Sequence, residues 1–186
     1  GVRAWQLLDT GFGVPKANII TQLVSDKTSA IEGFTAAQLY LDVIEDQLGP
    51  QVYPASEAGL SFSLNANSRG ISVVVAGYSD KQSVLLGDIL SALTKPKWDQ
   101  QRFDRLKQTR LRQMANFQRE YPFRQVIAGL YSIINVSWTP LEQRPVLEQI
   151  SLSDLQRFSR ELMAQMSVEM LVSGNQTAMD AQELIA

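Results

Sequence analysis

The sequence of 186 residues contains no cysteine and no histidine. Without cysteine the chain has no disulfide, no zinc finger and no thiol nucleophile. Without histidine it lacks Ser-His-Asp triads, imidazole acid–base chemistry and the commonest zinc ligand. It also lacks an apolar run that approaches the ~20 residues of a membrane-spanning helix. These absences make the chain a poor candidate for an independent enzyme.

The remaining composition is that of an ordinary globular domain. Hydrophobic residues make up 45% and charged residues 19%, and 17 basic residues stand against 19 acidic ones, for a net charge of −2. Extensive disorder is excluded, and the length suits one domain. The sequence begins without methionine and ends inside a helical pattern. We therefore expect a single domain over residues 1–186, cut from a longer chain; the alternative is a small complete protein with trimmed ends.

Alternating apolar residues predict strands, and apolar residues spaced three and four apart predict helices. The expected strands are 3–9, 18–24, 60–66, 71–78 and 168–173, and the expected helices are 29–48, 81–93, 99–117, 123–134, 141–149, 153–165 and 179–186. Residues 67–70 form the turn of a hairpin. A hairpin followed by massed helices predicts an α+β fold, with an antiparallel or mixed sheet covered by helices on one face.

The first long helix has apolar residues on more than one side, so we expect it to be largely enclosed. Phe34 and Ile44 belong to its buried face. Ser29 and Glu32 have the spacing of a capping box, and Gly49-Pro50 is expected to end the helix.

Common catalytic motifs are absent from the sequence. It contains no phosphate-binding glycine loop, no nucleophile elbow and no calcium loop. Asp42, Glu45 and Asp46 cluster on the first long helix, where a solvated or salt-bridged patch is expected rather than a zinc site.

Basic residues concentrate in one segment. Residues 95–124 carry nine basic and three acidic residues, a net charge of +6, whereas the rest of the chain carries −8. At ~100° per residue, Arg105, Arg112 and Arg119 fall within about 40° on one helix face. This stripe is either a solvated helix side or domain interface, or a surface that attracts anionic ligands. Arg110 projects into the apolar face and is expected to meet a carboxylate of the first helix. Nucleic-acid binding is not predicted, because the basic patch lacks interleaved aromatic residues and a binding motif, and the chain has no overall basic charge.

Several stretches, taken together, resemble a known family. They are Val14-Pro15-Lys16-Ala17-Asn18, Ala58-Gly59-Leu60-Ser61-Phe62, Gly70-Ile71-Ser72-Val73, Gly77-Tyr78-Ser79-Asp80-Lys81-Gln82, Arg102-Phe103-Asp104, Asn116-Phe117 and Val172-Ser173-Gly174-Asn175. Their order resembles the middle, or third, domain of the insulinase/pitrilysin zinc metallopeptidases. The similarity covers about residues 3 to 185.

The resemblance implies a function for the parent chain. Members of the family close two halves, each of two α+β domains, around a chamber that holds peptides. Their zinc motif, H-x-x-E-H, lies in the first domain. The equivalent helix here, 29–48, has no histidine, so no catalytic or zinc-binding residue is assigned, and zinc is expected only in the parent chain. The resemblance implies a non-catalytic domain that forms part of the chamber and of the interface between the halves.

The resemblance also implies partners. These are the other domains of the same peptidase, peptide substrate and polyanions, for which Arg105, Arg112 and Arg119 are the candidate contacts. One alternative is a scaffold subunit of a processing-peptidase-like assembly, and another is a polyanion-binding module. The resemblance favours a periplasmic location, with the cytoplasm as the alternative.

Overall fold

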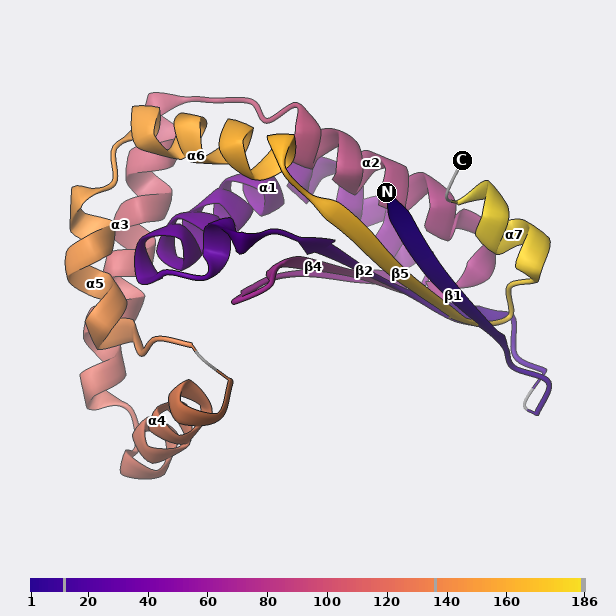
Figure 1. Ribbon diagram of the computed structural model, residues 1–186, viewed down its shortest axis with the longest axis horizontal. Helices are drawn as coiled ribbons and strands as arrows, with labels where there is room; N and C mark the ends of the chain where they lie inside the picture. Colours follow the sequence, from indigo (N-terminus) through magenta and orange to yellow (C-terminus); the bar gives the residue numbers. More distant parts are fainter. Residues whose placement is uncertain (12, 136, 185–186) are drawn as a thin grey trace.

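Five strands and seven α-helices make up the computed structural model over the residues it describes, 1–11, 13–135 and 137–184 (Figure 1). The strands are β1 (Val2–Leu8), β2 (Lys16–Val24), β3 (Leu60–Asn67), β4 (Gly70–Tyr78) and β5 (Ser167–Gly174). The helices are α1 (Ile31–Glu57), α2 (Gln82–Thr94), α3 (Gln100–Asn116), α4 (Pro122–Asn135), α5 (Pro140–Gln149), α6 (Leu152–Ala164) and α7 (Ala178–Glu183). The predicted α+β class is confirmed.

The sheet is mixed, with the strand order β1-β5-β2-β4-β3. β1 pairs with β5 in parallel, and the other neighbours pair antiparallel. The last strand therefore lies between the first two. Gly70 opens β4 at a φ of 130°, and a Cβ there would lie 1.9 Å from the carbonyl oxygen of Leu23. Only glycine allows this turn and the close approach to β2.

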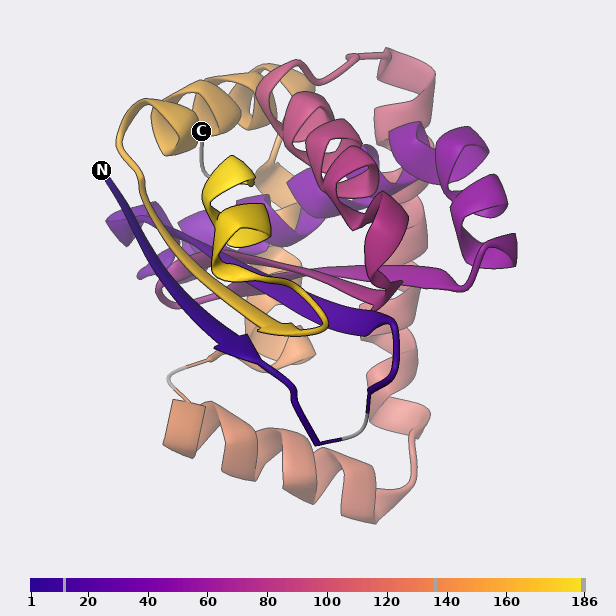
Figure 2. The ribbon, with the colours of Figure 1, turned by 90° about the vertical axis from the view of Figure 1, so that its right-hand side faces the viewer.

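Helices cover one face of the sheet (Figures 1 and 2). Along β2, Ala17, Ile19 and Leu23 are buried, whereas Asn18 and Ile20 on the other face are exposed. This alternation places the apolar set of the strand against α1 and α2. The predicted one-sided sheet is confirmed. α4 lies apart from this layer, beyond the end of α3 and on the uncovered side of the sheet (Figure 1).

α1 forms the centre of the domain. It packs on β3, α2, α3, α5 and α6. Phe34 and Ile44 are buried as predicted, and Tyr40 is completely enclosed and donates its hydroxyl hydrogen bond to the carbonyl oxygen of Leu93. This burial raises the pKa of the Tyr40 phenol well above its usual value. The expected enclosure of the helix is confirmed.

Both predicted ends of this helix are wrong. α1 continues through Pro50 and Pro54 to Glu57. The two prolines are exposed and four residues apart, so the backbone hydrogen bonds that they remove fall on one solvent-facing side. At the other end, Ala30 is the N-cap and no capping box forms. The hydroxyl of Ser29 instead donates to the carbonyl oxygen of Asp26, in the turn before the helix.

Two carboxylates of α1 hold α3 in place. The Nε and Nη2 atoms of Arg110 donate to the two carboxylate oxygens of Asp42, at 2.5 and 2.6 Å, and its Nη1 atom donates to Oε1 of Gln38 at 3.1 Å. The expected contact between Arg110 and an acid of the first helix is confirmed. Nearer the start of α3, Arg105 lies 2.7 Å and Arg102 3.5 Å from the carboxylate of Asp46.

We predict that the Arg110–Asp42 pair contributes more to stability than the Arg105–Asp46 pair. The side chains of Arg110 and Asp42 are only 21% and 25% exposed, whereas Arg105 is 61% exposed and more fully screened by water. A double-mutant cycle with Arg110→Met and Asp42→Leu, measured by urea unfolding, is expected to give a coupling of about 1–3 kcal/mol. The matched cycle with Arg105→Met and Asp46→Leu is expected to give less than ~1 kcal/mol. Equal couplings would contradict this account.

A second prediction concerns Gly33, where the turn Asp26–Thr28 packs against α1. A Cβ at Gly33 would lie 1.8 Å from the backbone oxygen of Lys27, so Gly33→Ala is expected to lower the free energy of unfolding by about 1–3 kcal/mol. Gly87 in α2 has nothing within 4 Å of its Cβ position, and Gly87→Ala is expected to raise stability by about 0.5–1 kcal/mol. Thermal unfolding of both variants checks the sign of each change.

Candidate functional site

The uncovered face of the sheet carries a row of apolar side chains. The strand register aligns Trp5, Leu171, Ile20 and Val74 across β1, β5, β2 and β4. Trp5 is 54% exposed, Leu171 38% and Ile20 40%. These residues have the outward phase of their strands, where polar side chains are usual. We call these four residues the apolar row.

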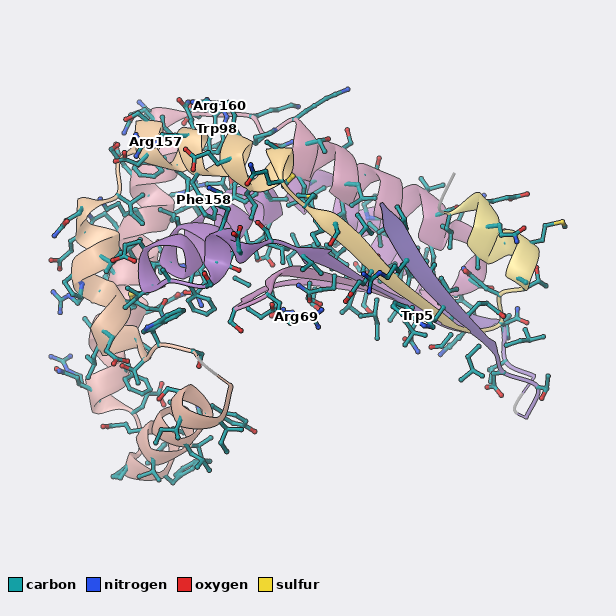
Figure 3. All side chains as sticks on the ribbon, in the orientation of Figure 1. Trp5, Arg69, Trp98, Arg157, Phe158 and Arg160 are labelled. Atoms are coloured by element: carbon teal, nitrogen blue, oxygen red, sulfur yellow. The ribbon has the colours of Figure 1, made fainter. Side chains whose placement is uncertain are left out.

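Polar side chains border the apolar row. On one side the register aligns Arg3, Glu169, Gln22, Ser72 and Asn65 across the five strands. Nη2 of Arg69 lies 2.9 Å from the Glu169 carboxylate, and the side-chain amide of Asn67 donates to Gln22 at 3.0 Å. Figure 3 shows Trp5 and Arg69 on the side of the sheet away from α1 and α2. This face therefore offers apolar contact next to hydrogen-bonding groups.

A hollow of about 460 Å³ adjoins the apolar row at the end of β1. It is lined by Leu7, Leu8, Asp9, Thr10, Gly11, Asn18, Ser173 and Gly174. Asp9 binds the backbone N–H of Gly11 through its carboxylate at 2.8 Å, and its own N–H donates to the carbonyl of Gly174. Backbone and side-chain polar groups thus surround an open recess at one end of the face.

The predicted arginine stripe is distributed over different environments. Arg105 is held by Asp46, and Arg112 is exposed and donates to Oγ1 of Thr109 at 3.2 Å. α3 ends at Asn116, and Arg119 lies in the following 3₁₀ turn. The stripe is thus not confined to one α-helix, because Arg119 lies beyond the end of α3. Contact of Arg105, Arg112 and Arg119 with polyanions or substrate stays a prediction.

The acids of α1 do not suit a zinc ion. A cavity of about 190 Å³ between α1 and β3 is lined in part by Gln38, Asp42, Glu45 and Arg110. The Arg110 guanidinium occupies both oxygens of Asp42. The pKa of Glu45 is raised above its usual value. Loss of hydration is the largest cause and the negative charge of Asp42 the next, and the positive charge of Arg110 only partly offsets them. Among the described residues, groups of three or more His, Cys, Asp or Glu able to hold a metal are absent.

The sequence did not point to the uncovered face as a surface. One signal in the sequence is the position of Ile20, an apolar residue in the polar phase of β2. Apolar helix α4 was predicted as a helix, but its exposure was not. In the part of the chain that the structure describes, none of the helices has the length and apolar character needed to cross a membrane.

Comparisons with known proteins agree with this architecture. The chain is 34% identical over 186 residues to "Putative zinc protease mug138" of Schizosaccharomyces pombe, a match that covers 99% of this chain and 19% of the relative. It is 33% identical over 142 residues to the insulin-degrading enzyme of Homo sapiens, covering 76% of this chain and 14% of the enzyme. The chain thus spans less than a fifth of the length of these relatives.

A solved structure and a family model match as well. The crystal structure of pitrilysin superposes with a TM-score of 0.89 at 22% identity, over 98% of this chain and 20% of that chain. The family model for the middle or third domain of M16 peptidases matches residues 1–144. The chain therefore belongs to the M16 peptidase family, in which zinc proteases and insulin-degrading enzymes are its relatives, and it corresponds to their middle or third domain.

Proposed function

We propose that this chain is a non-catalytic domain of a zinc-dependent endopeptidase and that its uncovered sheet face lines the chamber in which the parent enzyme holds peptides. The observation that carries the proposal is the apolar row on a sheet face that no helix of the described chain covers. The family relationship implies zinc in the parent chain, where the metal would supply an activated water for hydrolysis of a peptide bond. The described residues of this domain do not fit the metal, because the sequence has no histidine or cysteine and the carboxylates form no cluster of three or more.

The chemistry of the uncovered face suits a peptide with little regard to sequence. The apolar row offers contact to any apolar side chain, and the adjoining Glu169, Gln22 and Asn65 can exchange hydrogen bonds with a backbone. We infer that the parent enzyme selects peptides by whether they fit inside the chamber and by weak apolar contacts. A deep pocket that recognises one side chain fits this face less well.

The lengths of the relatives favour the interpretation that this chain is one domain of a peptidase over the alternative that it is a separate scaffold subunit. Because this chain matches 14–19% of those relatives, their remaining length can supply both the catalytic domain and the other walls. We propose that the partners of this domain are those other domains and the peptide substrate. A periplasmic location stays a prediction.

The proposal predicts that the 186-residue chain is inactive by itself. It is expected to bind no stoichiometric zinc and to hydrolyse no peptide, because it has neither histidine nor cysteine and Asp42 is already paired with Arg110. Metal analysis after dialysis against zinc, together with a quenched-fluorescence peptide assay, provides the measurement. One zinc per chain with cleavage that a chelator stops would refute the proposal.

The chamber role predicts a binding defect in the full-length peptidase. Trp5→Ala removes the largest side chain of the apolar row and is expected to raise KM for a long peptide about five- to tenfold. The turnover number kcat should not change, because a contact made equally in the ground and transition states affects binding alone. Val84→Ala, at a similarly exposed apolar residue on α2 of the helix layer, is the control and should leave KM unchanged. An unchanged KM for Trp5→Ala would contradict the chamber role.

A further inference from the structure

α4 presents its apolar side outward. At ~100° per residue, seven apolar residues of α4 fall within an arc of about 160°. They are Phe123, Val126, Ile127, Leu130, Tyr131, Ile133 and Ile134, and they are 46–81% exposed. We call them the apolar arc. An amphipathic helix normally turns such an arc toward the core of its own domain, so this orientation is the reverse of the usual one.

The opposite side of α4 faces the domain. Gln125, Ala128, Gly129 and Ser132 are half-buried. The side-chain amide of Gln125 donates to the carbonyl oxygens of Gln118 and Glu120, at 3.2 and 2.9 Å. Polar and small residues thus fix the helix to the end of α3. Among the described residues, Phe123 at the start of the apolar arc stacks on Tyr121 with ring centroids 6.1 Å apart, and the arc as a whole remains exposed. Figures 1 and 2 show α4 standing away from the layer of α1 and α2.

We propose that the apolar arc of α4 is the docking surface for a neighbouring domain of the same polypeptide, which receives it in an apolar, uncharged groove. This inference rests on the proposed function, because it needs a longer parent chain. Seven exposed apolar residues on 14 positions form a contiguous patch of the kind that marks an interaction site. The relatives, which are more than five times longer than their match to this chain, supply the polypeptide that would cover it.

Size and charge argue for a tethered partner. A specific interface between separate molecules engages ~20–30 residues on each side, and seven residues of one helix fall well short. A partner on the same chain needs less area, because the connection raises its effective concentration to the order of millimolar. A membrane surface is disfavoured, because helices that lie on membranes are rich in Lys and Arg, and α4 has Arg124 alone.

Photo-crosslinking in the full-length peptidase tests the proposal. Ile133→benzoylphenylalanine places the probe in the apolar arc, and irradiation is expected to join α4 to a peptide outside residues 1–186 of the same chain, as mapped by mass spectrometry. Arg124→benzoylphenylalanine places the probe just outside the apolar arc, half a turn around the helix axis from Ile133, and should give at least tenfold less of that product. A crosslinked species of doubled mass, a crosslink only to added substrate peptide, or no crosslink from position 133 would overturn the proposal.

Limited proteolysis gives a second measurement on the same protein. Leu130→Asp with Ile133→Asp is expected to speed trypsin cleavage after Arg119 and Arg124 at least tenfold, because charge in the apolar arc would expel α4 from its groove. Val84→Asp on α2 is the control and should leave cleavage at these two arginines unchanged. Unchanged cleavage in the double variant would count against the proposal.

The docking proposal and the chamber role can fail separately. An unchanged KM for Trp5→Ala would refute the chamber role, and the crosslink from position 133 would still be expected.

Discussion

Enclosure of α1 is the constraint on which the other layers depend. A helix with apolar residues on several sides is stable only when all of those sides are covered. The sheet covers one side, and α2, α3, α5 and α6 cover the others. Because these helices must gather around α1, they occupy one face of the sheet, and the opposite face receives none of them. The exposed apolar row is therefore a consequence of how α1 is buried.

The uncovered face and the apolar arc of α4 are two apolar surfaces of the described residues, and α4 itself lies on the uncovered side of the sheet (Figure 1). They differ in shape, because the sheet offers a broad face and α4 a convex ridge. A broad face with adjoining polar groups suits an extended peptide, whereas a ridge suits a groove in another folded domain. A domain seated on α4 would stand at the border of the face that we propose to contact peptide.

Much of the fold could be predicted from the sequence, because periodicity records burial. The alternation in β2 and the spacing of Phe34 and Ile44 gave the strand and the buried helix face. The predicted end of α1 at Pro50 was wrong. The sequence alone does not show that the backbone hydrogen bond lost at Pro50 lies on the solvent-facing side, where the helix tolerates its loss. The order of the strands in the sheet could not be predicted from sequence periodicity either, because pairing between strands far apart in the chain leaves no local pattern.

The candidate surfaces were harder to predict. The contact of Arg110 with an acid of α1 was predictable, because a charge on an apolar helix face requires a counter-charge. The exposure of α4 was not, because an apolar arc that meets another domain has the same pattern as one that meets its own core. The apolar row was missed for a related reason: its four residues come from four strands and align only once the register is set.

The position of β5 has a consequence for biosynthesis. β5 ends at Gly174, and it separates β1 from β2, which precede it by more than a hundred residues. β1 therefore has no neighbour to pair with until nearly the whole domain has left the ribosome. Such long-range pairing is slow, and an unpaired strand that carries Trp5 and Leu7 is a hazard for aggregation in the meantime. β1 is therefore the segment of the nascent domain that stays exposed longest, because its pairing must wait for the synthesis of β5.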